Sequence, residues 1–143
     1  MQFDLSRLTL EDVGRFYAGQ RMNDLEAMAD VMTKAANGAS ETMPDLLDLE
    51  MAEFNRISKA FTEADRAYAE GEPAASGVKV DLKKITARRM NTFYAKVRTN
   101  DLIGAGEVMK ECVNPWPEGD LSYSAYMGLL RAFLDAVKKT ATT

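Results

Sequence analysis

Paired carboxylates are the groups in this sequence whose spacing comes nearest to that of a catalytic or metal-binding site. Three pairs stand three or four residues apart, within reach of one another on a helix: Glu26 with Asp30, Glu50 with Glu53, and Glu107 with Glu111. Such pairs can bind a divalent cation or share a proton. Carboxylate metal sites on helices, however, usually recruit ligands from several helices, often with a histidine. We therefore interpret these pairs as solvated helix faces and expect neither a metal nor another cofactor.

The rarest residue types narrow the chemistry further. The sequence contains no histidine, which removes the commonest general base and the commonest transition-metal ligand. The single cysteine, Cys112, excludes an internal disulfide, and its place on an apolar stripe predicts a buried residue rather than a nucleophile. Gly104-Ala105-Gly106 falls inside an expected helix, so it predicts tight packing rather than a phosphate-binding loop. The sequence therefore favours a protein that is not an enzyme.

A run of basic residues is the one segment that resembles a nucleic-acid-binding surface. Seven positive charges stand in residues 79–98 against the single acid Asp81. The residues that would contact phosphate groups are Lys83, Lys84, Arg88 and Arg89. Phe93-Tyr94 lies close by, but the same pair recurs as Phe16-Tyr17 in an acidic part of the chain. We therefore assign both aromatic pairs to the core, and nucleic-acid binding is the alternative to a solvated or protein-binding basic face.

Three apolar side chains are the candidates for binding a protein partner: Trp116, Met51 and Phe54. Trp116 stands between two prolines, and it either locks its loop onto the core or serves as an exposed anchor. Met51 and Phe54 lie on the apolar stripe of a long expected helix. The nine methionines mostly occupy expected core positions, but flexible thioethers also suit a groove that accepts a partner helix.

The composition, with 46% hydrophobic and 28% charged residues, is that of a soluble globular protein. No segment approaches the roughly 20 apolar residues that span a bilayer, and the first residues lack the features of a signal peptide. We expect a cytosolic protein with no membrane partner. The net charge of -4 hides a division, because residues 1–76 carry 15 acids and 7 bases whereas residues 77–143 carry 7 acids and 11 bases. This asymmetry can hold the halves together, order identical copies head to tail, or present a basic face to an anionic partner.

The two halves of the sequence resemble each other when one is shifted by 77 positions. Residues 3–37 then align with residues 80–114 without a gap and share 13 identities in 35 positions, whereas roughly two are expected from average composition. Phe-Tyr-Ala followed at a fixed distance by Asn-Asp-Leu occurs in both copies. We interpret this pattern as a tandem duplication, with an acidic unit at residues 1–70, a linker at 71–79 and a basic unit at 80–143.

Each unit is expected to contain three helices, so the predicted fold is all-α with six helices in two compactly packed groups. Thr9 and Thr86 have the position of N-caps for the first helices, and Asn23 has that of the N-cap for the second helix. The second helices are expected to stop at Asn37-Gly38 and at Asn114-Pro115.

The third helices and the starts of the two units carry weaker signals. One third helix is expected from Pro44, through an apolar stripe that includes Leu47, to about Glu70. The other is expected to start at Asp120 or Ser122. Residues 3–5 and 78–82 alternate apolar and polar residues, so as short strands they would pair with each other across the repeat; otherwise each is an extended lead-in.

Two stretches of the first unit resemble those of a known family. Leu8-Thr9-Leu10-Glu11-Asp12-Val13 opens a helix, and Asp45-Leu46-Leu47-Asp48-Leu49-Glu50-Met51-Ala52-Glu53-Phe54 leads into a long amphipathic one, while Trp116-Pro117-Glu118-Gly119-Asp120 precedes the last helix. With these motifs, the chain resembles the small helical tail assembly chaperones of long-tailed bacteriophages, although the tandem form departs from that family. The resemblance covers most of the chain loosely.

This resemblance implies a non-catalytic protein of the cytoplasm, which is the bacterial host cytoplasm if the chain is phage-encoded. Such a protein engages a long hydrophobic client helix, the tape-measure protein, during viral tail assembly, and is able to form a homo-oligomer. The leading hypothesis from the sequence is therefore an assembly chaperone whose apolar, Met-rich groove takes a partner helix. The alternative is a small nucleic-acid-binding subunit of a larger complex, using the basic face of residues 79–98.

Overall fold

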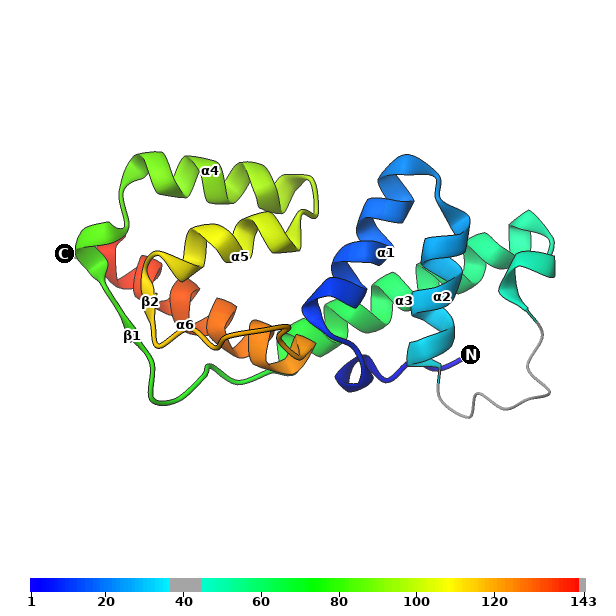
Figure 1. Cartoon of the computed structure of the whole chain (residues 1–143), viewed down its shortest axis with the longest axis horizontal. Helices are drawn as coiled ribbons and strands as arrows, with labels where there is room; N and C mark the ends of the chain where they lie inside the picture. Colours follow the sequence, from blue (N-terminus) through cyan, green and yellow to red (C-terminus); the bar gives the residue numbers. More distant parts are fainter. Residues whose placement is uncertain (37–44, 142–143) are drawn as a thin grey trace.

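The computed structural model describes residues 1–36 and 45–141 of the chain (Figure 1). Within these ranges, the chain forms six α-helices and one pair of very short strands. The helices are α1 (Leu10–Met22), α2 (Leu25–Ala35), α3 (Met51–Gly71), α4 (Ala87–Arg98), α5 (Leu102–Lys110) and α6 (Tyr123–Ala141), and the strands are β1 (Lys79–Val80) and β2 (Val113–Asn114). The all-α fold predicted from the sequence is confirmed.

The first helix of each half begins as the threonine spacing predicts. The Thr9 hydroxyl accepts a hydrogen bond from the Asp12 N–H (3.1 Å), and the Thr86 hydroxyl accepts one from the Arg89 N–H (3.2 Å). Each bond satisfies an amide that has no partner inside the helix, which favours a helix start at that residue. A turn of 3-10 helix precedes each threonine, at Leu5–Arg7 and at Leu82–Lys84.

The second helices begin one residue later than predicted. The N-caps are Asp24 and Asp101, whose carboxylates accept from the N–H three residues on. Asn23 is not the cap; it takes the left-handed conformation with φ 57°, and Asn100 does the same with φ 54°. Asparagine tolerates this conformation better than most residues, so the Asn-Asp order places the turn first and the cap second.

The ends of the second helices also differ from the prediction. The helix α5 ends at Lys110, so the expected stop at Asn114-Pro115 is wrong, because Val113 and Asn114 form β2. The helix α2 ends at Ala35, and the expected stop at Asn37-Gly38 lies outside the described residues.

The two lead-in segments do not pair with each other. Instead, β1 pairs antiparallel with β2, so that Val80 lies opposite Val113, and Phe3 forms a single antiparallel bridge with Ala36. The Asp4 N–H donates to the Ala35 carbonyl and the Asp81 N–H to the Cys112 carbonyl, both at 2.8 Å. In each half the first two helices are antiparallel, so the chain returns to the level at which the first helix began. Each lead-in segment therefore forms its hydrogen bond at the end of the second helix of its own half.

The starts of the two third helices differ, because a side-chain cap is present at α6 and absent at α3. The helix α3 begins at Met51, after a turn of 3-10 helix at Leu46–Asp48, so Leu47 is not on its apolar stripe and is 46% exposed. The expected start at Pro44 lies outside the described residues. Of the two starts predicted for α6, Ser122 is the cap, because its hydroxyl accepts from the Ala125 N–H (3.1 Å).

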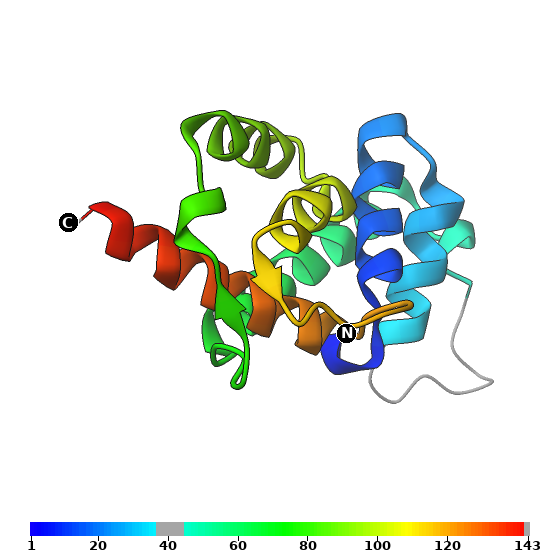
Figure 2. The same cartoon turned by 60° about the vertical axis from the view of Figure 1, so that its left-hand side comes forward.

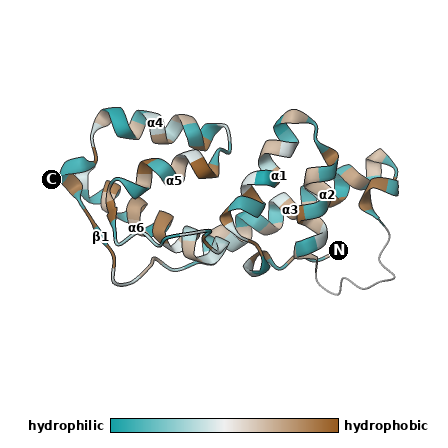
Figure 3. Cartoon of the chain, viewed as in Figure 1, coloured by the Kyte–Doolittle hydropathy of each residue, from teal (hydrophilic) through white to brown (hydrophobic). Residues whose placement is uncertain are grey.

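Helices of both halves contribute to one hydrophobic cluster. Figure 3 shows that hydrophobic and hydrophilic residues alternate along the helices, as amphipathic helices require. Phe16 packs on Phe61 with ring centroids 4.2 Å apart, and Phe93 packs on Phe133 at 5.1 Å. The prediction that the aromatic pairs are core is confirmed for the phenylalanines and for Tyr17, but it is wrong for Tyr94, which is 46% exposed.

The two halves are joined along their sides. In Figures 1 and 2, α1 lies beside α5, and the two helices are in contact. The Leu10 N–H donates to the Leu121 carbonyl (2.8 Å), and the Tyr123 N–H donates to the Leu8 carbonyl (2.9 Å). The expected linker follows α3 and packs on α6, where the Ala75 N–H donates to the Gly128 carbonyl (2.9 Å). Residues of the linker are therefore part of the packed structure.

Candidate partner-binding site

The loop that carries Trp116 forms one wall of an open hollow of about 430 Å³. The loop spans residues 115–121, between β2 and α6. The hydrogen bond from the Leu10 N–H to the Leu121 carbonyl holds its far end against the start of α1. The third wall is α5, which contributes Ile103, Gly106, Glu107 and Lys110. Three segments that are distant in sequence therefore enclose this site.

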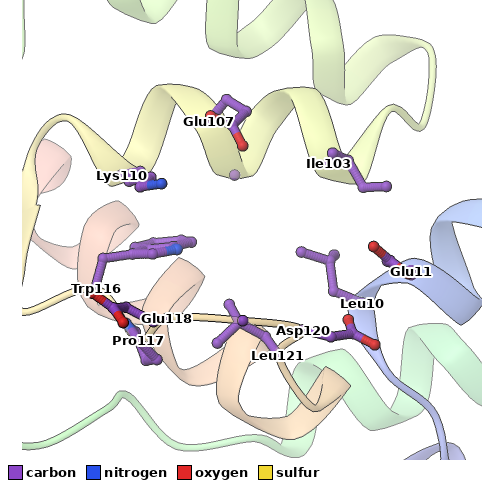
Figure 4. Close-up of a pocket in the computed structure, with 12 residues that line it drawn as sticks. Leu10, Glu11, Ile103, Glu107, Lys110, Trp116, Pro117, Glu118, Asp120 and Leu121 are labelled. Carbon is purple, nitrogen blue, oxygen red and sulfur yellow. The ribbon is translucent and has the colours of Figure 1, made fainter.

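Apolar groups form the lower part of the hollow. Figure 4 shows Trp116 and Leu10 on opposite sides of an open space, with Leu121 beneath and Ile103 above Leu10. Trp116 is partly buried, and Ile103 is 45% exposed. The loop is thus fixed on the core by a tryptophan that keeps part of its surface exposed, as the first of the two interpretations expects; the role of an anchor for a partner stays a prediction.

A glycine keeps the hollow deep. A Cβ atom on Gly106 would lie 3.3 Å from the Tyr126 ring and 3.9 Å from both Leu10 and Trp116. A larger side chain at this position would therefore occupy the space between the two apolar walls. Gly104, two residues earlier and therefore on the other face of α5, is also packed tightly, since a Cβ there would lie 2.8 Å from the Lys96 side chain. The prediction of tight packing for Gly104-Ala105-Gly106 is confirmed.

Acidic side chains surround the opening. Four exposed carboxylates line the hollow: Glu11, Glu107, Glu118 and Asp120. Lys110 is the single basic residue among the lining residues. Within the described residues, these four make no ion pair. Carboxylates that share an opening raise the local concentration of cations, and an indole face attracts a cation at short range. The hollow therefore suits a ligand that combines an apolar group with a positive charge.

The other two predicted partner-binding residues lie elsewhere. Met51 and Phe54 line a second hollow of about 410 Å³, between α3 and the turn that joins α1 to α2, together with Leu25 and Met28. Met51 is 53% exposed, but Phe54 is 3% exposed and belongs to the core. The structure thus brings Met51 and Phe54 together and separates both from Trp116.

The methionines lie partly in the core and partly at the surface. Four of them are buried in the core and come from α2, α5 and α6: Met28, Met32, Met109 and Met127. The most exposed ones are Met22 at 80%, Met1 at 54% and Met51 at 53%. Four of the eight methionines in the described residues therefore fill the interior, while Met28 and Met51 line one hollow together, and the Met-rich groove expected from the sequence stays a prediction.

The basic segment mixes with acids in the folded chain. Lys83, Lys84 and Arg88 are exposed, but Arg89 is partly buried and its Nη1 donates to the Cys112 sulfur at 3.7 Å. Cys112 is 3% exposed, as predicted. Arg88 and Arg89 line a hollow between α4 and α5 whose other wall holds two carboxylates, Glu107 and Glu111. These acids would repel a phosphate backbone at that hollow.

Similarity to known proteins does not assign a function to the chain. No protein-family model, no curated protein and no solved structure matches it. No helix in residues 1–36 and 45–141 is long and apolar enough to cross a membrane. In the same residues, no three acidic or cysteine side chains gather as they would around a metal ion.

One buried polar cluster was not predicted from the sequence. The carboxylate of Asp65 on α3 accepts hydrogen bonds from the hydroxyls of Tyr17 on α1 and Tyr123 on α6. Burial and then the charge of Asp65 raise the pKa of both tyrosines above its ordinary value, because both disfavour the phenolate. With Asp65 only 8% exposed, the cluster holds three helices together. The available signal was an acid four residues after Phe61 on an otherwise apolar stripe.

Proposed function

We propose that this chain is a non-enzymatic interaction protein that binds a basic amphipathic helix of a protein partner in the Trp116 hollow. The observation that carries the proposal is the combination of apolar walls at Trp116 and Leu10, with Gly106 between them, and an opening surrounded by four carboxylates. An amphipathic helix presents apolar side chains three and four positions apart, with charged ones beside them, which fits such a surface.

The open form of the hollow favours a macromolecular ligand. Its volume of about 430 Å³ is within the range of small-molecule sites, but the walls come from three separate segments and the charged groups are all exposed. A partner side chain can enter from solvent while the rest of its helix stays outside. Trp116, flanked by prolines, supplies a rigid aromatic surface of the kind that dominates binding energy at protein interfaces.

The resemblance to tail assembly chaperones extends this proposal to a cytoplasmic assembly role. In that role the client would be a long helical protein of the tape-measure type, and the chain would hold it during viral tail assembly. The support for this extension is the sequence resemblance together with an exposed site for a helix. The Trp116 hollow replaces the Met-rich groove as the place where the client helix binds.

The single tryptophan of the chain makes a direct test available. Two helical peptides of equal length would share the same leucine positions, one with lysine and the other with glutamate at every polar position. We expect the lysine peptide to change the fluorescence of Trp116 in a saturable way and the glutamate peptide to leave it unchanged. Equal binding of both peptides, or binding of neither, would overturn the proposal.

A matched pair of variants separates the site from net charge. The double variant Glu107→Gln/Glu118→Gln removes two carboxylates of the hollow, and Glu26→Gln/Glu63→Gln removes two exposed carboxylates elsewhere. Both have the same net charge. We expect only the first to weaken binding of the lysine peptide, by about tenfold if the two carboxylates together contribute about 1.4 kcal/mol. An equal loss in the second variant would show attraction to overall charge instead.

Nucleic-acid binding through residues 79–98 stays a prediction. Its support is the exposure of Lys83, Lys84 and Arg88, and the carboxylates of Glu107 and Glu111 stand against it. It predicts salt-dependent binding of single-stranded nucleic acid that Lys83→Ala/Lys84→Ala weakens. Absence of binding at low salt would remove this alternative.

A further inference from the structure

The contact between the two halves has two chemically distinct sides. On the first half, Tyr17 and Asp65 face α6, and Tyr68 stacks on Tyr123 with centroids 5.7 Å apart and planes at 17°. On the second half, the Arg131 Nη2 donates to the Ala69 carbonyl at the end of α3 (2.9 Å). Aromatic stacking and charged hydrogen bonds therefore join the end of α3 to the start of α6.

A second contact joins the ends of the helical pairs. The Arg21 guanidinium, near the end of α1, donates to the carbonyl of Thr99, which follows α4. The two halves therefore contact each other through different sides. The side of the first half contains Tyr17, Arg21 and Asp65. The side of the second half contains Thr99, Tyr123 and Arg131.

Each of these residues has an equivalent in the other half. The pairs α1 with α4 and α2 with α5 begin 77 positions apart, and α3 and α6 begin 72 positions apart, at Met51 and Tyr123. Two contacts of the same kind confirm both offsets, since Phe16 packs on Phe61 as Phe93 packs on Phe133. The offsets therefore say which residue of one half stands where a contact residue stands in the other.

The equivalents of the first side lie in the second half, and two of the three are exposed to solvent. Tyr94 stands in the place of Tyr17 and is 46% exposed, whereas Tyr17 is 7% exposed. Arg98 stands in the place of Arg21 and is exposed, and Val137 stands in that of Asp65 and is partly buried. We call these three residues the Tyr94 face.

The equivalents of the second side lie in the first half and are open as well. Met51 stands in the place of Tyr123 and is 53% exposed, whereas Tyr123 is 2% exposed. Met22 stands in that of Thr99 and is 80% exposed, and Lys59 replaces Arg131 as an exposed base. We call these three residues the Met51 face. Two of them, Met51 and Lys59, line the hollow of about 410 Å³. The buried Ser58 hydroxyl, which has no partner among the described residues, lies in the same hollow.

The start of α3, which carries Met51, and the last turns of α6, which carry Val137, lie at opposite ends of the molecule, and these two ends differ in charge. Figure 1 shows α3 and α6 nearly end to end along the long axis, with the start of α3 at one end and the end of α6 at the other. Exposed acids gather before and at the start of α3, at Asp45, Asp48 and Glu50, whereas the last turn of α6 carries Lys138 and Lys139. Opposite charges at the two ends favour contact between copies in one direction.

We propose that a second copy of this chain docks its Met51 face on the Tyr94 face of the first, which repeats the contact that joins the two halves inside each copy. The Tyr94 ring enters the hollow beside Met51, and its hydroxyl meets the otherwise unpaired Ser58. Arg98 donates to the end of α1 in the second copy, as Arg21 donates to the end of α4 within one copy. Because the two faces differ, every added copy leaves one of each open, and the assembly grows head to tail. The Trp116 hollow takes no part in it.

The test uses two variants of the full chain that each remove one face. Tyr94→Glu and Met51→Glu place a charge at an exposed residue, so both are expected to fold. In sedimentation velocity across a wide range of concentrations, the unmodified chain is expected to form species larger than a dimer, and each variant alone only monomers. Mixing the two variants leaves one intact face on each partner, and the expected product is a dimer that grows no further.

Each other outcome overturns the proposal. A monomeric unmodified chain at every concentration would show that the faces do not bind, and a variant that still forms long assemblies would place the contact elsewhere. A mixture that stays monomeric would point to a symmetric interface instead. Ile103→Gln, which changes an exposed apolar residue of the Trp116 hollow, serves as the control and is expected to assemble like the unmodified chain.

Discussion

Tyr17 and Tyr94 are aligned when the two halves of the sequence are compared, but one is buried and the other is exposed. Each follows a buried phenylalanine and meets its ring nearly edge-on, at 5.2 Å for Phe16 with Tyr17 and 5.7 Å for Phe93 with Tyr94. Tyr17 then donates to Asp65, whereas the position of Asp65 in the second unit holds Val137. The phenylalanine thus packs inside its own half in both cases. The surroundings of the tyrosine depend on the residues that neighbouring helices place beside it. The comparison separates residues that build a unit from residues that join units.

The largest expected effect comes from removing the acid that only the first unit has. Asp65→Ala leaves the buried hydroxyls of Tyr17 and Tyr123 without an acceptor, and we expect a loss of about 3 kcal/mol of stability. Urea denaturation at neutral pH would measure it. The triple variant Asp65→Val/Tyr17→Phe/Tyr123→Phe replaces all three buried polar groups by apolar ones and is expected to recover most of this loss. No recovery would mean that the cluster acts through packing alone.

The same cluster predicts how stability changes at high pH. The pKa of Tyr17 and of Tyr123 is raised above 10.0, first by burial and then by the charge of Asp65. Below pH 10 both the folded and the unfolded chain keep these protons, so the contribution is complete. Above pH 10 the unfolded chain loses them first, and stability falls by about 1.4 kcal/mol per pH unit for each tyrosine. Denaturation series above pH 10 should be shallower for Tyr17→Phe than for the unmodified chain; identical slopes would contradict the prediction.

One substitution made in both units tests the comparison directly. Tyr17→Phe removes a hydrogen bond to a buried carboxylate, and we expect a loss of about 1.5 kcal/mol at neutral pH. Tyr94→Phe removes an exposed hydroxyl and is expected to change the stability of the monomer by less than about 0.5 kcal/mol. Thermal unfolding of the two variants at low concentration would compare them. Equal losses would mean that the environments are more alike than the exposed fractions indicate.

The smallest expected effect concerns the helix starts. Asp12 accepts from the Thr9 N–H (3.0 Å) and pairs with Lys34 (2.6 Å), whereas the second unit has Arg89 at that position. We expect Asp12→Ala to cost about 1 kcal/mol and the neighbouring control Glu11→Ala no more than a few tenths. A large effect of Glu11→Ala would show that first-turn charge matters more than the specific bond.

The sequence contained enough to predict the helices and too little to predict their neighbours. Thr9, Thr86 and Ser122 act through bonds to residues three positions away, so their role can be read locally. Asn23 was assigned the role of Asp24 because both residue types cap helices, and only the φ angle of the turn distinguishes them. The 72-position offset of the third helices could not be predicted. The segments before these helices differ in length, and the ungapped similarity between the two halves ends at residue 37.

The candidate site was predictable only in part. Trp116 stood out because it is the single tryptophan and has no counterpart, but the hollow beside it depends on Leu10 and Ile103, which local patterns place in two ordinary helices. Phe54 was misassigned, since the apolar stripe of an amphipathic helix does not show which part of the stripe a neighbouring helix covers. Burial of Asp65 could be suspected from its position, but its two partners come from separate helices.

The bridge between Thr9 and Ser122 ties the order of synthesis to the order of folding. Leu8 and Leu10 lie at the start of α1, and their backbone partners, Tyr123 and Leu121, leave the ribosome only after four of the five other helices. Until then the Leu8 carbonyl and the Leu10 N–H lack these partners, although α5, which packs beside α1, has already been made. The start of α1 therefore obtains its last backbone partners late. In a chain stalled before residue 121, the Leu8 carbonyl and the Leu10 N–H would stay without these partners.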